Sequence, residues 1–115
     1  MKRTIVLDFD GVIHSYTSGY QGRFTIPDPP VEGIADAIRE LRKDFRVVVV
    51  STRCQYTGGV SAVIGWLHKW GIQVDDVRAT KPPAVVYVDD RALCFDGDAA
   101  ALPDKIRNFK TWQGK

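Results

Sequence analysis

Two apolar runs that each end in a pair of aspartates place the strongest constraint on how this chain folds. The first run ends in Asp8 and Asp10, and the second ends in Asp89 and Asp90. Side chains on a strand alternate between its two faces, so Asp8 and Asp10 lie on the same side. Two carboxylates this close repel each other unless one is protonated or a cation lies between them. Neighbouring strand ends that brought the two pairs together would form an oxygen-rich pocket of the kind that Mg2+ prefers.

Strand and helix signals alternate along the chain. Strands are predicted over residues 4–9, 47–50 and 85–88, with weaker signals over 72–77 and 93–95, and helices are predicted over residues 32–43, 60–70 and 98–109. The run 47–50 is continuously β-branched, which is typical of a strand buried on both faces. The alternation predicts an α/β domain with a Rossmann-like, three-layer fold, in which helices, the last one included, cover both faces of a parallel sheet. In such sheets the site lies outside the carboxyl ends of the strands, where Ser51 and Arg53 also fall.

A long irregular segment follows the first predicted strand. Residues 11–33 are rich in Gly and Pro, and they predict a loop with a short hairpin around residues 19–22. A loop of this length inside a compact domain is usually functional. Within it, residues 14–30 are too few for a cap domain and predict a short flap. We therefore expect one domain over residues 1–115, with a site that is open to bulky substrates unless a second subunit covers it.

The composition is that of an ordinary globular protein, with 44% apolar and 26% charged residues. The net charge of +2 is too small to indicate nucleic-acid binding by itself. No apolar run is long enough to span a membrane, and the stretch before Asp8 is too short for a signal peptide. Cys54 and Cys94 match no metal-ligand spacing, which favours a reduced, cytoplasmic setting. We expect a monomer or a weak homodimer.

The polar groups at the predicted strand ends resemble, in order, the four motifs of the haloacid dehalogenase-like (HAD) phosphatases. In chain order the matching segments are Asp8-Phe9-Asp10-Gly11-Val12, the strand that ends in Ser51, Lys81, and Val88-Asp89-Asp90. The resemblance covers residues 4–90 and is to a small, capless member of the family. Ser51-Thr52-Arg53 and Asp89-Asp90-Arg91 are also similar to groups in the phosphatase domain of polynucleotide kinase-phosphatases.

The resemblance implies a Mg2+-dependent phosphohydrolase that acts through an aspartyl-phosphate intermediate. It makes Asp8 the nucleophile and Asp10 the general acid and then the general base. Gly11 would permit a backbone conformation that a side chain would block. Lys81 would hold Asp8 and the phosphoryl oxygens by its charge.

The resemblance also implies the remaining contacts of the site. Ser51 would donate a hydrogen bond to the phosphoryl group, with Thr52 as the alternative, although a Ser after a strand is more often a cap. Arg53 could contact the substrate phosphate, whereas Arg91 fits better as the partner of a neighbouring acid. The Mg2+ ligands would be Asp8, Asp10 through its backbone carbonyl, Asp89 and Asp90.

The substrate class is open at this level. The small flap favours a bulky substrate such as a nucleic-acid 3′-phosphate, and small metabolites or nucleotides are the alternative. A phosphate-binding or regulatory domain without turnover, a phosphorelay receiver domain and a metal nuclease also use paired acids. A receiver carries its acceptor after a later strand, and a nuclease leaves Ser51 and Lys81 without a role. We expect His14 to be a surface or hydrogen-bonded structural residue, with a place at the entrance of the site as the alternative. We expect Trp66 and Trp70 to pack in the core or at its edge, with base stacking as the alternative.

Overall fold

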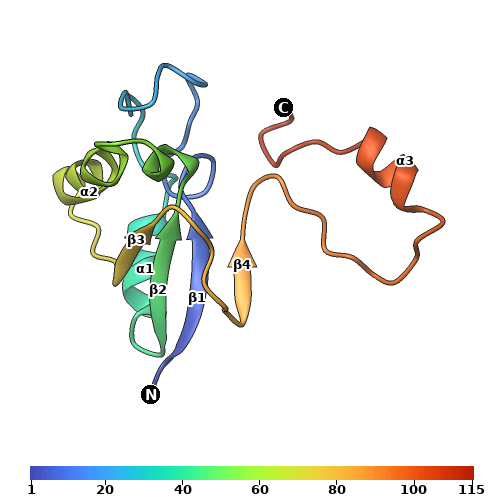
Figure 1. Cartoon of the computed structure of the whole chain (residues 1–115), viewed down its shortest axis with the longest axis horizontal. Helices are drawn as coiled ribbons and strands as arrows, with labels where there is room; N and C mark the ends of the chain where they lie inside the picture. The colour runs from blue at the N-terminus through green and yellow to red at the C-terminus, as the bar shows by residue number, and fades with distance from the viewer.

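In the computed structural model, which describes residues 1–115, four parallel strands form one sheet in the order β3-β2-β1-β4 (Figure 1). The elements are β1 (Arg3–Asp8), α1 (Ile34–Leu41), β2 (Phe45–Val50), the 3-10 turn η1 (Thr52–Gln55), α2 (Gly59–Lys69), β3 (Asp76–Arg78), β4 (Val86–Val88) and α3 (Leu102–Arg107). The register pairs Asp8 with Val50 and Leu7 with Val88, so the carboxyl ends of β1, β2 and β4 meet at one edge. The predicted α/β class, with a parallel, Rossmann-like sheet, is confirmed.

The main core lies on one face of the sheet, against α1 and α2. The strands contribute alternate residues, and the helices contribute the apolar stripes that the 3.6-residue period predicts. The buried members of this cluster are Ile5, Leu7, Phe9, Ile13, Ile38, Val47, Val49, Val63, Trp66, Leu67 and Ile72. Residues 47–49 are fully buried, as expected for a central strand of a parallel sheet.

The opposite face of the sheet is covered by the connection between β3 and β4, residues 79–85, rather than by a helix. Figure 1 shows this segment crossing in front of β2 and β1, and Ala84 packs on the second buried cluster, Val6, Val48 and Val50. A crossover between parallel strands usually takes about a dozen residues or more. The shorter segment here, which includes Pro82 and Pro83, crosses in a nearly extended form and has no length left for a helix. The helix layer expected on this face is therefore an extended loop.

The flap, residues 14–30, is closed at its base by main-chain hydrogen bonds and contains no hairpin. The Ser15 N–H donates to the Pro29 carbonyl over 2.9 Å, and the Val31 N–H donates to the Ile13 carbonyl over 2.8 Å. Where we expected a hairpin, residues 19–22 contain no strand. The pairing is made instead by isolated bridges from His14 to Asp10 and to Pro30. The flap is therefore tied to the end of β1 through His14.

After β4 the chain leaves the sheet and forms a C-terminal arm, residues 91–115. The strand predicted over 93–95 is absent, and the final helix is α3, with no buried residue; Figure 1 shows it apart from the sheet. The prediction that this helix packs inward was wrong, because nothing returns the chain to the sheet after β4. The arm is held at its end, where Trp112 Nε1 donates to the Gly11 carbonyl over 2.7 Å. No helix of the structure is both long and apolar enough to cross a bilayer.

Candidate active site

Three of the four predicted acids converge where β1 and β4 end. Asp8 is the last residue of β1, and Asp89 and Asp90 directly follow β4, its hydrogen-bonded neighbour. One carboxylate oxygen from each acid lies within 4.8 Å of the others. They line a hollow of about 300 Å³, whose lining residues are Asp8, Asp10, Tyr16, Ser51, Thr52, Asp89, Asp90 and Arg91. The topology thus brings residues 8 and 90 together, as the fold rule for parallel sheets predicts.

The negative charges of these three acids repel one another. Burial, followed by the charge of Asp89, raises the pKa of Asp8 to about 8. Burial also raises the pKa of Asp90, and the charge of Asp89 adds to this effect. The protein alone therefore favours a proton shared within the pair of Asp8 and Asp90. A hard divalent cation bound among these oxygens would favour the ionised form instead, so the donor set fits Mg2+.

Gly11 allows Asp90 to approach β1. Its φ is +86°, and a Cβ built on it would lie 2.2 Å from Asp90 Oδ2. Contact this close exists only because the position has no side chain. The structure therefore gives Gly11 a steric role, in addition to the backbone freedom that the sequence predicts.

We expect Gly11→Ala to weaken Mg2+ binding by about 10- to 100-fold, the usual effect of disturbing the support of a metal ligand. The new methyl group displaces the Asp90 carboxylate from the cluster. Gly19→Ala is the matched control, because its φ is +73° and nothing lies within 4 Å of the added Cβ. Titration calorimetry of both variants with Mg2+ checks this expectation. Equal affinities for the two variants would contradict the steric role of Gly11.

Asp10 faces a different set of partners from the other acids. His14 Nδ1 lies 2.8 Å from its Oδ1, and Arg53 Nε donates to its Oδ2 over 2.9 Å. Burial alone would favour the neutral acid, but the hydrogen bonds from His14 and Arg53 lower the pKa of Asp10. Its side chain is not one of the three that could hold a cation. The backbone contact to metal that the resemblance implies for Asp10 stays a prediction.

The hydroxyl groups after β2 lie beside the acids. Ser51 is buried, and its Oγ accepts a hydrogen bond from the Arg53 N–H over 3.2 Å, so it caps η1. Thr52 is exposed and lines the hollow beside it. Ser51 therefore caps η1, as a Ser after a strand often does, and it also lies next to the acids. Thr52 has the freer hydroxyl for a bound oxyanion.

The basic residues differ in how directly they reach the site. Lys81 Nζ lies 3.7 Å from Asp89 Oδ2, and Lys81 shares a neighbouring hollow with Asp8. Arg91 lines the main hollow, and its side chain makes no ion pair within 4.0 Å; only its main-chain N–H donates to Asp89. The acid partner expected for Arg91 is thus absent. Arg53 is 3% exposed and does not line the hollow, because its guanidinium bonds to Asp10 and to flap carbonyls.

Two residues of the flap lie near the site; sequence patterns did not single out Tyr16, and His14, which could have lined the entrance, does not line the hollow. Tyr16 lines it with a φ of +59°, unusual for a residue other than glycine. His14 is fully buried between the flap and β1. No periodic signal marks residues in an irregular loop, so only the fold places them.

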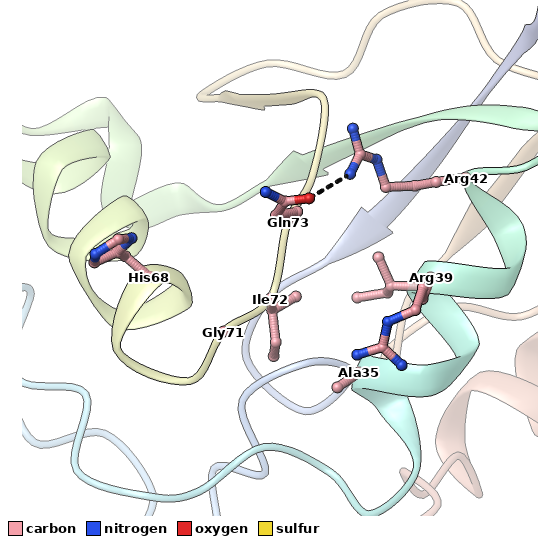
Figure 2. A pocket seen from close by; sticks show the side chains of 8 residues that line it. Ala35, Arg39, Arg42, His68, Gly71, Ile72 and Gln73 are labelled. Carbon is pink, nitrogen blue, oxygen red and sulfur yellow. Dashed lines mark hydrogen bonds between the residues drawn. The ribbon is translucent and has the colours of Figure 1, made fainter.

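The cavity drawn in Figure 2 lies at the other end of the sheet. It has a volume of about 330 Å³ and lies between α1 and the segment that ends and follows α2. Among its lining side chains one hydrogen bond is present, in which Arg42 Nη1 donates to Gln73 Oε1 over 3.3 Å. No acid or hydroxyl lines it; its residues are Ala35, Ile38, Arg39, Arg42, His68, Gly71, Ile72 and Gln73. It therefore lacks the groups for the chemistry that the acid cluster offers.

No protein-family model matches this chain, and no curated protein or solved structure matches it either. The function has to be inferred from the residues and from the geometry described above.

Proposed function

We propose that this chain is a Mg2+-dependent phosphohydrolase of the HAD type, small and without a cap domain, that cleaves phosphomonoesters through an aspartyl-phosphate. The observation that carries the proposal is the convergence of Asp8, Asp89 and Asp90 at the carboxyl ends of β1 and β4. Asp10 and Lys81 lie beside this cluster, each in contact with groups of the site. We further propose that it acts in the cytoplasm as a monomer or a weak homodimer.

In the proposed reaction an Asp8 oxygen forms a bond to phosphorus while the bond from phosphorus to the leaving oxygen breaks. Asp10 takes a proton from solvent before this step and gives it to the leaving oxygen. It then takes a proton from the water that attacks phosphorus, as the bond from phosphorus to Asp8 breaks and inorganic phosphate leaves. Thr52 or Ser51 donates a hydrogen bond to the phosphoryl oxygens, and Lys81 supplies positive charge. When bound, Mg2+ supplies the charge that keeps Asp8 ionised and offsets that of the phosphate.

The aromatic and basic residues around the flap favour a bulky substrate. Tyr20, Phe24 and Tyr56 are all about half exposed or more, and the Arg23 guanidinium lies 3.8 Å from the centre of the Tyr56 ring. Exposed rings beside basic groups suit stacking on nucleic-acid bases. This observation supports a nucleic-acid end ahead of a sugar phosphate, and the similarity of Ser51-Thr52-Arg53 and Asp89-Asp90-Arg91 to groups in polynucleotide phosphatase domains favours the 3′-phosphate.

The decisive experiment is hydrolysis of 4-nitrophenyl phosphate by the purified chain with Mg2+ and with excess EDTA. We expect turnover only with the metal. Binding of phosphate without any turnover would instead support a phosphate-binding or regulatory domain. Cleavage of phosphodiester DNA or RNA in place of the monoester would favour the nuclease alternative.

We expect an oligonucleotide 3′-phosphate to have a kcat/KM at least about tenfold above that of a small sugar phosphate, roughly 1.4 kcal/mol of transition-state binding. Contacts to remote parts of a large substrate lower the barrier at the reacting atoms, and a small phosphate cannot make them. Initial rates for the oligonucleotide, its 5′-phosphate isomer, a phosphopeptide and a sugar phosphate, compared side by side, check this. If the monomeric enzyme preferred the sugar phosphate or a mononucleotide, the open site would not select for large substrates.

We expect Asp10→Asn to lower kcat by about 10²- to 10⁴-fold, the usual contribution of a general acid or base. Release of an aryl leaving group could still proceed, because 4-nitrophenolate needs no proton. Burst kinetics check this, since an intermediate that forms but is not hydrolysed gives one equivalent of nitrophenol and then stops. A normal steady-state rate would rule out the role of Asp10.

A further inference from the structure

Two buried side chains, Arg53 and His14, hold the Asp10 carboxylate by hydrogen bonds. Arg53 donates from Nε to Oδ2 over 2.9 Å and from Nη2 to Oδ1 over 3.2 Å, a bidentate pair. His14 Nδ1 lies 2.8 Å from the same Oδ1. His14 is 0% exposed and Arg53 is 3% exposed, so water does not compete for these contacts.

The protonation of His14 follows from its second nitrogen. The Asp28 N–H donates to His14 Nε2 over 3.1 Å, so Nε2 is an acceptor and carries no proton. Nδ1 therefore carries the proton and donates it to Asp10. Asp28 lies near the C-terminal end of the flap, and its side chain also accepts a hydrogen bond from the Ser18 N–H. His14 thus links Asp10 to the C-terminal end of the flap.

Arg53 makes a second link between Asp10 and the flap. Its Nη1 donates to the carbonyl oxygens of Gly22, Arg23 and Thr25 over 2.7, 2.8 and 3.3 Å. One guanidinium therefore joins Asp10 to three main-chain carbonyls within residues 22–25 of the flap. An Arg buried this deeply is tolerated only when its N–H groups are satisfied, so the flap conformation and the Asp10 contact depend on each other.

We propose that His14 and Arg53 are positioning residues that set the orientation of the Asp10 carboxylate and make that orientation depend on the closed flap. The proposal rests on the proposed function of Asp10 as acid and base. A general acid must stand within about 2.6–3.2 Å of the oxygen it protonates, so a carboxylate free to rotate would lose much of its effect. Arg53 then acts through Asp10, rather than on the substrate phosphate.

The first test compares two leaving groups in His14→Phe and Arg53→Met. An alkyl phosphate needs a proton on its leaving oxygen, whereas 4-nitrophenyl phosphate does not. We expect kcat at the optimum of each variant's pH profile to fall at least about tenfold more for the alkyl phosphate, part of the range for general acid catalysis, with KM little changed. His14→Asn keeps a donor near the position of Nδ1 and should recover most of the loss.

Trp66→Phe is the matched control for this test. Trp66 packs on both Phe9 and His14, and its Nε1 donates to the Asp28 carbonyl over 3.2 Å, but it does not touch Asp10. It disturbs the same buried cluster without freeing the carboxylate, so its effect on the two substrates should be equal. An equal loss on both substrates in His14→Phe and Arg53→Met as well would reduce His14 and Arg53 to structural residues and overturn the proposal.

The second test needs no activity. Arg53→Met should release the main chain around Arg23, so trypsin should cut after Arg23 several times faster than in the wild-type chain, as followed by mass spectrometry. Arg42→Met is the control, because Arg42 pairs with Asp75 far from the flap. Unchanged cleavage at Arg23 would overturn the link to the flap. An inactive wild-type chain would refute the proposed function, and this arm would still decide whether Arg53 orders the flap.

Discussion

Replacing Asp8 with Asn should lower kcat for every phosphomonoester by at least about a thousandfold, as removal of a nucleophile does in other enzymes. The Asn amide has the same shape but cannot attack phosphorus. The fold should survive, because Asp8 ends β1 at the edge of the hollow and is not part of the apolar core. Steady-state rates and a thermal melt of the same sample check both statements.

Asp75→Asn is the matched control for that substitution. It makes the same chemical change at an acid that accepts from the Val47 N–H over 2.7 Å and pairs with Arg42, away from the site. It should cost stability and leave the rate unchanged. A near-normal rate in Asp8→Asn, or a beryllium fluoride adduct found on another carboxylate, would reassign the nucleophile.

Removal of Mg2+ should abolish turnover and also change how stability depends on pH. The folded pKa of Asp8 is about 8 against an ordinary value of 3.8, so the folded state binds the extra proton between these values. Its contribution to stability is therefore full below about pH 4 and is lost as the pH rises towards 8. In EDTA the melting temperature of the wild-type chain should fall across this window, and that of Asp8→Asn should fall less.

Saturating Mg2+ should reverse the trend, because only the ionised acids bind it. At a concentration 100 times its Kd, a ligand that binds the folded state alone adds about 2.7 kcal/mol of stability. Thermal melts at several pH values, with Mg2+ and with EDTA, give both curves, and Asp90→Asn serves as the variant that lacks a ligand. Full activity in EDTA, or identical stability curves in the two buffers, would contradict the assignment of a metal to this site.

The parts of the structure that the sequence predicts are those with a period or a local rule. The β-branched composition of residues 47–50 predicts a buried strand. Asp8 and Asp90 lie close together because parallel strands place their carboxyl ends at one edge of the sheet. The cover that residues 79–85 give to the second face was not predicted, since helices were expected on both faces of the sheet. The segment 79–85 is too short to cross the sheet with a helix, and its two prolines favour an extended backbone.

The surroundings of Asp10 could not be predicted for a different reason. Its partners come from positions 14 and 53, and they depend in turn on main-chain groups between residues 22 and 28. All of these contacts involve irregular segments, where side-chain direction follows from the whole fold and not from spacing. The same holds for the arm, where the apolar spacing of residues 102–109 predicts a packed helix but no neighbouring element lies against it.

The attachment of the C-terminal end beside the hollow has a practical consequence for how this protein is prepared. Trp112 and Gln113 donate to the carbonyls of Gly11 and Ser15, so any sequence fused after Lys115 starts next to the mouth of the site. Met1 is fully exposed, and Figure 1 shows the N-terminus at the opposite end of β1. An affinity tag, a fluorescent fusion or a surface tether therefore belongs at the N-terminus, where it leaves the approach of a large substrate clear.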